Sequence, residues 1–142
     1  MPPSLQALAV QLAQRRWPWW IGVMAWGGVL FMLSANSAPH TGPEFPFKDK
    51  IAHCLYFSAG AFCFALGLFS RPGVKVLRAV AWGLLFGALC GALDEWHQTF
   101  TPGRSGNDPD DWLADITGGL LGGWIAWHFL RRFSRPAGDR SP

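Results

Sequence analysis

The side chains most able to do chemistry in this sequence are gathered in three short stretches and one loop. Within the stretches they recur at intervals of three or four residues, which places them on one face of a helix. Carboxylates, amides and cations at such spacing suit the binding of a charged ligand, acid–base catalysis or coordination of a hard metal ion. The candidate binding residues are Asp49, Lys50, His53, Tyr56, Asp94, Glu95, Gln98, Arg104, Asp111 and Asp115.

Members of this set favour different kinds of chemistry. Arg104 follows a Pro-Gly turn, where its guanidinium would make bidentate contact with a phosphate, and Lys50 would add a point charge beside it. His53 and Glu95 are the candidates for a general acid or base. The carboxylates would suit magnesium or calcium better than zinc, because no cysteine and no pair of histidines accompanies them. We therefore predict no cofactor and no assigned metal ligand, and keep a divalent cation as the alternative.

Long apolar runs separate the polar stretches and must position them. Half of the 142 residues are hydrophobic, only 15% are charged, and nine are Trp. An apolar helix of ~20 residues crosses the ~30 Å hydrocarbon core of a bilayer. We predict an all-α protein, a four-helix transmembrane bundle in a single domain over 1–142, with a short disordered tail over 133–142. The four predicted spans are 17–35, 51–69, 76–96 and 112–130.

The first apolar run has two interpretations. Arg15 and Arg16 precede it, and the sequence from Ala35 to Ser37 resembles a cleavage site, as in a secretory signal peptide. Four Trp residues and a long apolar run favour a helix that stays in place as an anchor. We therefore predict a retained first span.

Basic residues are distributed unevenly about the predicted spans. Nine of the twelve Lys and Arg flank the ends that share one side, and eight of the nine acids fall on the other side. The positive-inside rule then predicts that both termini are cytoplasmic and that the polar stretches face outward. The basic residues form no patch interleaved with aromatics, so nucleic acid is not expected as a partner. The predicted location is the bacterial inner membrane, as a multi-pass protein.

Small residues recur four apart in three of the spans. Such rows let helix backbones approach closely where lipid removes the usual hydrophobic incentive to pack. Packing within one chain is the favoured interpretation, and an oligomer formed through the same glycine-rich faces is the alternative. The rows are Ala59, Cys63 and Gly67; Gly83, Gly87 and Gly91; and Gly118 with Gly122 beside Gly119 with Gly123.

Several of the polar residues also have a purely structural interpretation. Asp110 and Asp111 at the start of a helix would complement its dipole and cap it. His97 would suit an interfacial belt. Asp94, Glu95 and Asp115, by contrast, fall within the predicted spans, where a carboxylate is costly and usually faces a partner or a wet cavity. Function, or an ion pair that shapes a functional cavity, is the favoured interpretation for these three acids.

Three motifs occur in order along the chain, and together they resemble the VanZ-like membrane protein family over roughly residues 17–131. The family's namesake is associated with resistance to the glycopeptide teicoplanin, and most members have no established biochemical activity. Asp115 occupies a place that is Asn in many members, so the resemblance does not imply that its charge is required. The motifs are Asp49-Lys50-x-x-His53-x-x-Tyr56, Asp94-Glu95-x-x-Gln98-x-Phe100-x-Pro102-Gly103-Arg104, and Asp111-x-x-x-Asp115-x-x-Gly118.

These observations leave three functions open. The leading hypothesis is a non-enzymatic or weakly enzymatic cell-envelope protein that binds an anionic membrane lipid or a lipid-linked cell-wall precursor and so affects glycopeptide susceptibility. The rival is an enzyme acting on a phosphorylated lipid, with acid–base carboxylates and a divalent metal. Ion or proton transport is disfavoured, because the charges stop near the outer third of the spans.

Overall fold

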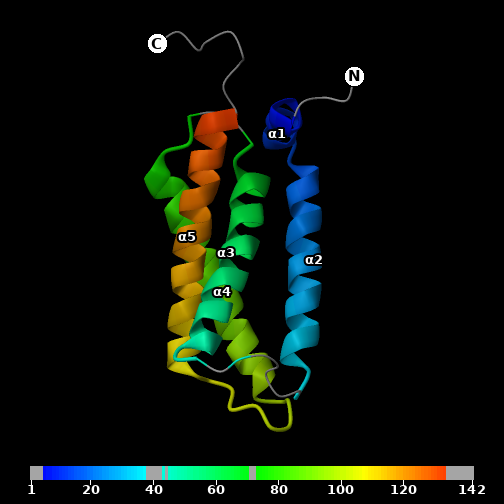
Figure 1. The fold of residues 1–142 in the computed structure, drawn as a ribbon, viewed down its shortest axis with the longest axis vertical. Helices are drawn as coiled ribbons and strands as arrows, with labels where there is room; N and C mark the ends of the chain where they lie inside the picture. The colour runs from blue at the N-terminus through cyan, green and yellow to red at the C-terminus, as the bar shows by residue number, and fades with distance from the viewer. Residues whose placement is uncertain (1–4, 38–42, 44, 71–72, 134–142) are drawn as a thin grey trace.

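The computed structural model describes residues 5–37, 43, 45–70 and 73–133. Within these ranges the chain is helical and contains no β-strand, which confirms the all-α prediction (Figure 1). Residues 134–142 of the predicted tail lie outside the described residues, and Phe133 ends the last helix. The helices are α1 (Leu5–Gln14), α2 (Trp17–Ser34), α3 (Lys48–Leu68), α4 (Val76–Gln98) and α5 (Pro109–Phe133).

The four long helices run alternately up and down. Figure 1 shows the end of α2, the start of α3, the end of α4 and the start of α5 at one end of the bundle. The start of α2, α1 and the end of α5 lie at the other end. The three polar stretches of the sequence are therefore brought to the same end.

The short helix α1 was not predicted from the sequence. Ten residues are too few for a stable isolated helix, so its formation depends on docking. Ala13 is fully buried, and the indole N–H of Trp19 donates to the carbonyl of Leu12 at 2.9 Å. Helix α1 is therefore stabilised by tertiary contacts, which the periodicity of the sequence cannot reveal.

Helices α3 and α5 extend beyond the apolar runs that predicted them. Helix α3 begins at Lys48 instead of residue 51, and α5 begins at Pro109 instead of residue 112. Proline suits a first helical turn, and the Asp108 side chain accepts a hydrogen bond from the amide of Asp110 at 2.9 Å. Lys50 and Asp111 consequently lie in the first turns of helices, in fixed positions.

Three helices, α2, α3 and α4, are long and apolar enough to cross a membrane. Helix α5 is longer, at 25 residues, but has charged residues at both ends, with Asp110 and Asp111 in its first turn and Arg131 and Arg132 in its last. The described residues thus contain three candidate spans by length and composition, and the fourth predicted span remains a prediction.

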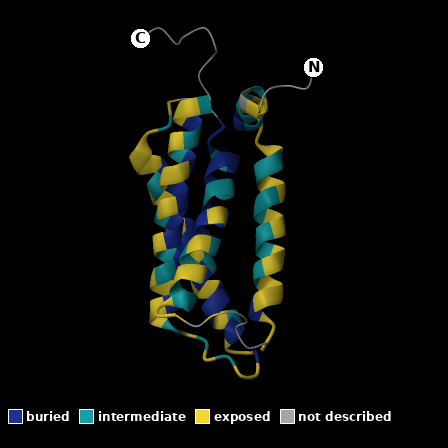
Figure 2. Ribbon diagram, viewed as in Figure 1, coloured by how far each residue is buried: buried dark blue, intermediate teal, exposed yellow. Residues whose placement is uncertain are grey.

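Helix α5 packs against α3 and α4 through glycine. A Cβ atom added at Gly87 would lie 2.5 Å from the carbonyl oxygen of Asp115, and one added at Gly123 would lie 2.5 Å from that of Ala79. Gly118 likewise meets the backbone of Cys54. The glycine rows are therefore used within the chain, and Figure 2 shows the buried positions concentrated on these three helices.

Helix α2 is attached differently, through aromatic side chains. Trp26 stacks on Tyr56 with ring centroids 5.5 Å apart and also contacts Phe57 and Phe86. The Trp26 indole donates to the carbonyl of Tyr56 at 2.9 Å, and the Tyr56 hydroxyl donates to the carbonyl of Trp26 at 2.8 Å. Ser34 is the only buried residue of α2, and most of the helix is exposed (Figure 2).

Candidate functional site

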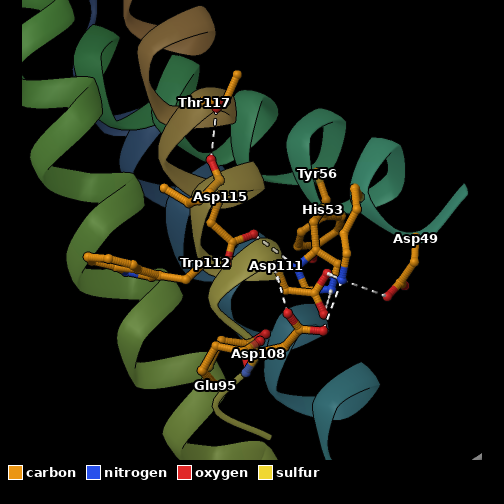
Figure 3. Close-up of polar contacts among 12 residues, drawn as sticks. Asp49, His53, Tyr56, Glu95, Asp108, Asp111, Trp112, Asp115 and Thr117 are labelled. Atoms are coloured by element: carbon orange, nitrogen blue, oxygen red, sulfur yellow. Dashed lines mark hydrogen bonds and ion pairs between the residues drawn. The ribbon is translucent and has the colours of Figure 1, made fainter. Parts of the chain in front are cut away.

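A cavity of about 430 Å³ lies at the end of the bundle where the polar stretches meet. Its walls come from α2, α3, α4 and the connection that follows α4. Six of the ten predicted site residues line it: Asp49, His53, Tyr56, Asp94, Gln98 and Arg104. The other four, Lys50, Glu95, Asp111 and Asp115, contact or approach the lining residues, as Figure 3 shows for the three acids among them.

Lys50 is the centre of an ion-pair network beside the cavity. Its ammonium lies 2.5 Å from Oδ1 of Asp111, 3.0 Å from Oδ2 of Asp108 and 3.9 Å from Oδ2 of Asp49 (Figure 3). The hydrogen bond from Lys50 holds the pKa of the Asp108 carboxyl below its ordinary value. The charge of Lys50 thus pairs with acids of the protein, and the predicted contact of Lys50 with a ligand phosphate stays a prediction.

His53 is oriented by a buried carboxylate. Its Nδ1 lies 2.9 Å from Oδ1 of Asp115, which is fully buried. Its Nε2 lies 3.9 Å from Oδ2 of Asp111, and its ring lies parallel to that of Phe57. With Nδ1 donating to Asp115, Nε2 keeps a lone pair that is available to another partner.

Asp94 joins the ends of two helices. It is only 5% exposed, accepts a hydrogen bond from the hydroxyl of Ser34, and accepts another from Nε2 of Gln98 at 2.9 Å. Thr101 then donates to the carbonyl of Ser34 at 2.9 Å. This carboxylate, predicted as a site residue, therefore also anchors the end of α2 to α4 and the following connection.

Glu95 holds the connection before α5. Its Oε2 accepts a hydrogen bond from the amide of Asp108 at 2.6 Å, and its side chain is almost fully buried at 4% exposure. Its Oε1 is buried without a hydrogen-bond partner among the described residues. A buried acceptor without a donor is costly, so a partner that binds this oxygen would be stabilised there.

Basic and apolar side chains both line the cavity. Arg104 donates from Nη2 to the carbonyl of Leu33 at 3.2 Å, while its buried Nε has no acceptor among the described residues. Lys48 adds a second cation to the lining, and Leu30 and Phe57 supply apolar surface. The cavity can therefore accept an amphiphile with an anionic group.

Two sets of three side chains have donor atoms close enough to hold a metal ion. In each set all the donor atoms lie within 4.8 Å of one another, and His53 belongs to both. One set adds Asp49 and Asp111, and the other adds the buried Asp94 and Glu95.

Sequence reasoning missed two residues of the site. Asp108 was not among the predicted site residues, although it pairs with Lys50 and its amide meets Glu95. Ser34, whose hydroxyl donates to Asp94, was not singled out either. Their positions in the sequence could have indicated them, because each lies at an end of an apolar run, on the side where the other polar residues gather.

A family model described as VanZ/LLP1 matches residues 19–131 of the chain. The match covers all three motifs and confirms the resemblance seen in the sequence. No curated protein and no solved structure matches the chain.

Proposed function

The chain belongs to the VanZ/LLP1 family, and we propose that it is a multi-pass membrane protein that binds the anionic head group of a lipid in the cavity lined by α2, α3, α4 and the connection after α4. The ligand would be a membrane lipid or a lipid-linked cell-wall precursor. Binding, without chemical conversion, is the activity that the geometry supports best.

The presence of two basic side chains beside apolar surface in the cavity carries this proposal. Arg104 and Lys48 are able to meet a phosphate, and the unpaired Nε of Arg104 is a donor directed to no protein acceptor among the described residues. Leu30, Leu33 and Phe57 supply the apolar surface that an acyl or prenyl chain needs. A free inorganic anion would make no use of that apolar surface.

The exposed surface supports a membrane setting. Large apolar side chains of α2 are widely exposed, including Met24 at 76% and Met32 at 65%. An apolar surface of this extent is expected to be covered by lipid. We propose that α5 is the fourth span, that both termini are cytoplasmic by the positive-inside rule, and that the cavity opens towards the outer leaflet of the bacterial inner membrane.

An effect on glycopeptide susceptibility would follow from the same binding. If the ligand is a lipid-linked cell-wall precursor, binding at the outer leaflet would change how much precursor is displayed. We infer that any such phenotype depends on the cavity residues and is lost with Arg104.

The test is mass spectrometry of lipids that copurify with the intact protein. We compare the wild type with Arg104→Ala, and use Arg131→Ala at the opposite end of the bundle as the matched loss of one arginine. Enrichment of a phosphorylated lipid in the wild type and in Arg131→Ala, reduced about tenfold in Arg104→Ala, supports the proposal; the loss of one charge-assisted contact is worth about this factor. Identical profiles in all three proteins would overturn it.

The His53–Asp115 pair supports a second candidate, an enzyme that hydrolyses a phosphorylated lipid. A carboxylate-oriented imidazole is able to take a proton from a water molecule that attacks phosphorus, with Glu95 as a further acid–base group. This candidate requires turnover of a prenyl phosphate or related lipid by the purified protein, abolished in folded Glu95→Gln. A ligand that stays intact while bound excludes it.

A further inference from the structure

We propose that Nε2 of His53 and the carboxylates of Asp94 and Glu95 bind one divalent cation of the manganese or magnesium class. Donor atoms of the three side chains lie within 4.8 Å of one another. They come from α3 and α4, two helices held in fixed register by α5. The site lies next to the cavity, so a bound cation would also meet the phosphate of a ligand there, a consequence that rests on the proposed function.

The orientation of His53 is the first argument. A metal-binding imidazole usually donates its other N–H to a carboxylate, which fixes the ring and its tautomer. Asp115 is placed to accept that bond from Nδ1 at 2.9 Å, and it is fully buried. Nε2 is then left as a preoriented ligand atom.

The acids show the same kind of support. Both oxygens of Asp94 accept hydrogen bonds, from Ser34 and Gln98, and each oxygen retains a second lone pair for a cation. Glu95 is held through Oε2 by the amide of Asp108, which leaves Oε1 buried without a donor among the described residues. A cation would satisfy this orphaned oxygen directly.

The local charge balance favours a cation of two charges. Six carboxylates lie in and beside the cavity, against three Lys and Arg side chains and one histidine. Even with His53 protonated, two negative charges remain uncompensated beside the almost fully buried Asp94 and Glu95. The acids are Asp49, Asp94, Glu95, Asp108, Asp111 and Asp115, and the cations are Lys48, Lys50 and Arg104.

The alternative set of ligands, which replaces Asp94 and Glu95 with Asp49 and Asp111, is less suitable. Oδ1 of Asp111 already lies 2.5 Å from the ammonium of Lys50. A divalent cation there would be repelled by that ammonium. Asp94 and Glu95, by contrast, are almost fully buried, at 5% and 4% exposure.

The ligand types narrow the choice of ion. Two carboxylates and one imidazole suit Mn²⁺, and carboxylate-rich sites that retain water also take Mg²⁺. Mn²⁺ is the useful probe, because it is paramagnetic and its bound and free forms are distinguished by electron paramagnetic resonance.

The experiment titrates the full-length protein with Mn²⁺ in detergent after treatment with EDTA, and measures binding by electron paramagnetic resonance. We expect one Mn²⁺ per chain, with affinity reduced about 10- to 100-fold in Glu95→Gln. Asp110→Asn is the matched control and should bind Mn²⁺ as the wild type does. It removes the charge of an exposed acid at the start of α5, outside the proposed site.

A second measurement uses the wild type and does not depend on whether a variant folds. Electron spin echo modulation of the bound Mn²⁺ should reveal coupling to an imidazole ¹⁴N, and His53→Gln should remove it. Absence of Mn²⁺ binding, absence of the nitrogen coupling in the wild type, or equal losses in Glu95→Gln and Asp110→Asn would each overturn the cation site. Since no lipid is required, failure here is distinct from failure of the lipid proposal.

Discussion

Helices α5 and α2 are both long, but the rest of the bundle holds them by different means. Helix α5 buries eight residues, four of them glycines that bring its backbone against α3 and α4. Helix α2 buries only Ser34 and is attached by aromatic rings and a few hydrogen bonds. The acids of the site lie mainly on the glycine-packed helices, and α2 supplies apolar wall.

This difference suggests that the glycine-packed helices and α2 have different roles. Backbone packing leaves little freedom, so it suits residues that must keep a fixed geometry, such as His53 and Asp115. Side-chain packing on a largely exposed helix is weaker and more adaptable. We expect α2 to move outward when an acyl or prenyl chain enters, while the polar cluster stays in place.

The strongest test of this comparison adds one methyl group to each helix in turn, by replacing a glycine of α5 and a glycine of α2 with alanine. In Gly119→Ala, the new Cβ meets the backbone of Gly83 and Gly87, which cannot move cheaply. We expect a loss of about 3 kcal/mol in the free energy of unfolding. Thermal unfolding in detergent, followed by circular dichroism, measures the change.

Gly28→Ala in α2 is the matched control for this substitution. A Cβ added at Gly28 meets nothing within 4 Å, and alanine is the better helix former by about 1 kcal/mol. We expect unchanged or slightly raised stability. Equal destabilisation by the two substitutions would remove the distinction between the two regions.

A smaller effect is expected from loosening α2. Trp26→Phe keeps an aromatic ring against Phe57 and Phe86 but removes the indole N–H that donates to Tyr56. The loss should be about 1 kcal/mol, the typical contribution of one hydrogen bond. Hydrogen–deuterium exchange should show faster exchange in α2 and little change in α5.

Trp124→Phe provides the comparison for the tryptophan substitution. Trp124 is 48% exposed on α5, and the same change there should leave exchange in α2 unaltered. Faster exchange throughout the bundle in Trp26→Phe would show that α2 is an integral part of the core, contrary to the comparison.

The contrast between the two regions also explains what could be predicted from the sequence. Hydrophobic runs located four long helices, because apolar length is a local property. The glycine spacing predicted close packing, but it could not say that Gly83 meets Gly119 while Gly118 meets Cys54. Which faces pair depends on the whole bundle.

For the candidate site, too, the residues could be predicted from the sequence but their pairing could not. Residue types and motif order selected His53, Asp94 and Asp115, but helical spacing could not say which side chain pairs with which, because the partners are about 60 positions apart in the chain. Lys50 pairs with Asp108 and Asp111 in the structure, and its predicted contact with a ligand phosphate stays a prediction. Such distant pairings are set by the fold.

The smallest effect is expected where the rigid region meets solvent. Asp108→Asn keeps a side-chain oxygen that is able to cap α5 but removes the charge that pairs with Lys50. Asp108 is one-third exposed, so the destabilisation should stay below about 1 kcal/mol at neutral pH. Thermal unfolding over a range of pH measures it.

The pH dependence gives this prediction its sign. Because the pKa of Asp108 is lower in the folded protein, its ionised form contributes stability above the ordinary carboxyl pKa, and that contribution disappears as the pH falls through the lowered value. The wild type and Asp108→Asn should therefore differ near neutral pH and converge in acid. A difference that persists unchanged in acid would mean that Asp108 acts through its cap and packing, and that the Lys50 pair adds nothing to the stability of the glycine-packed region.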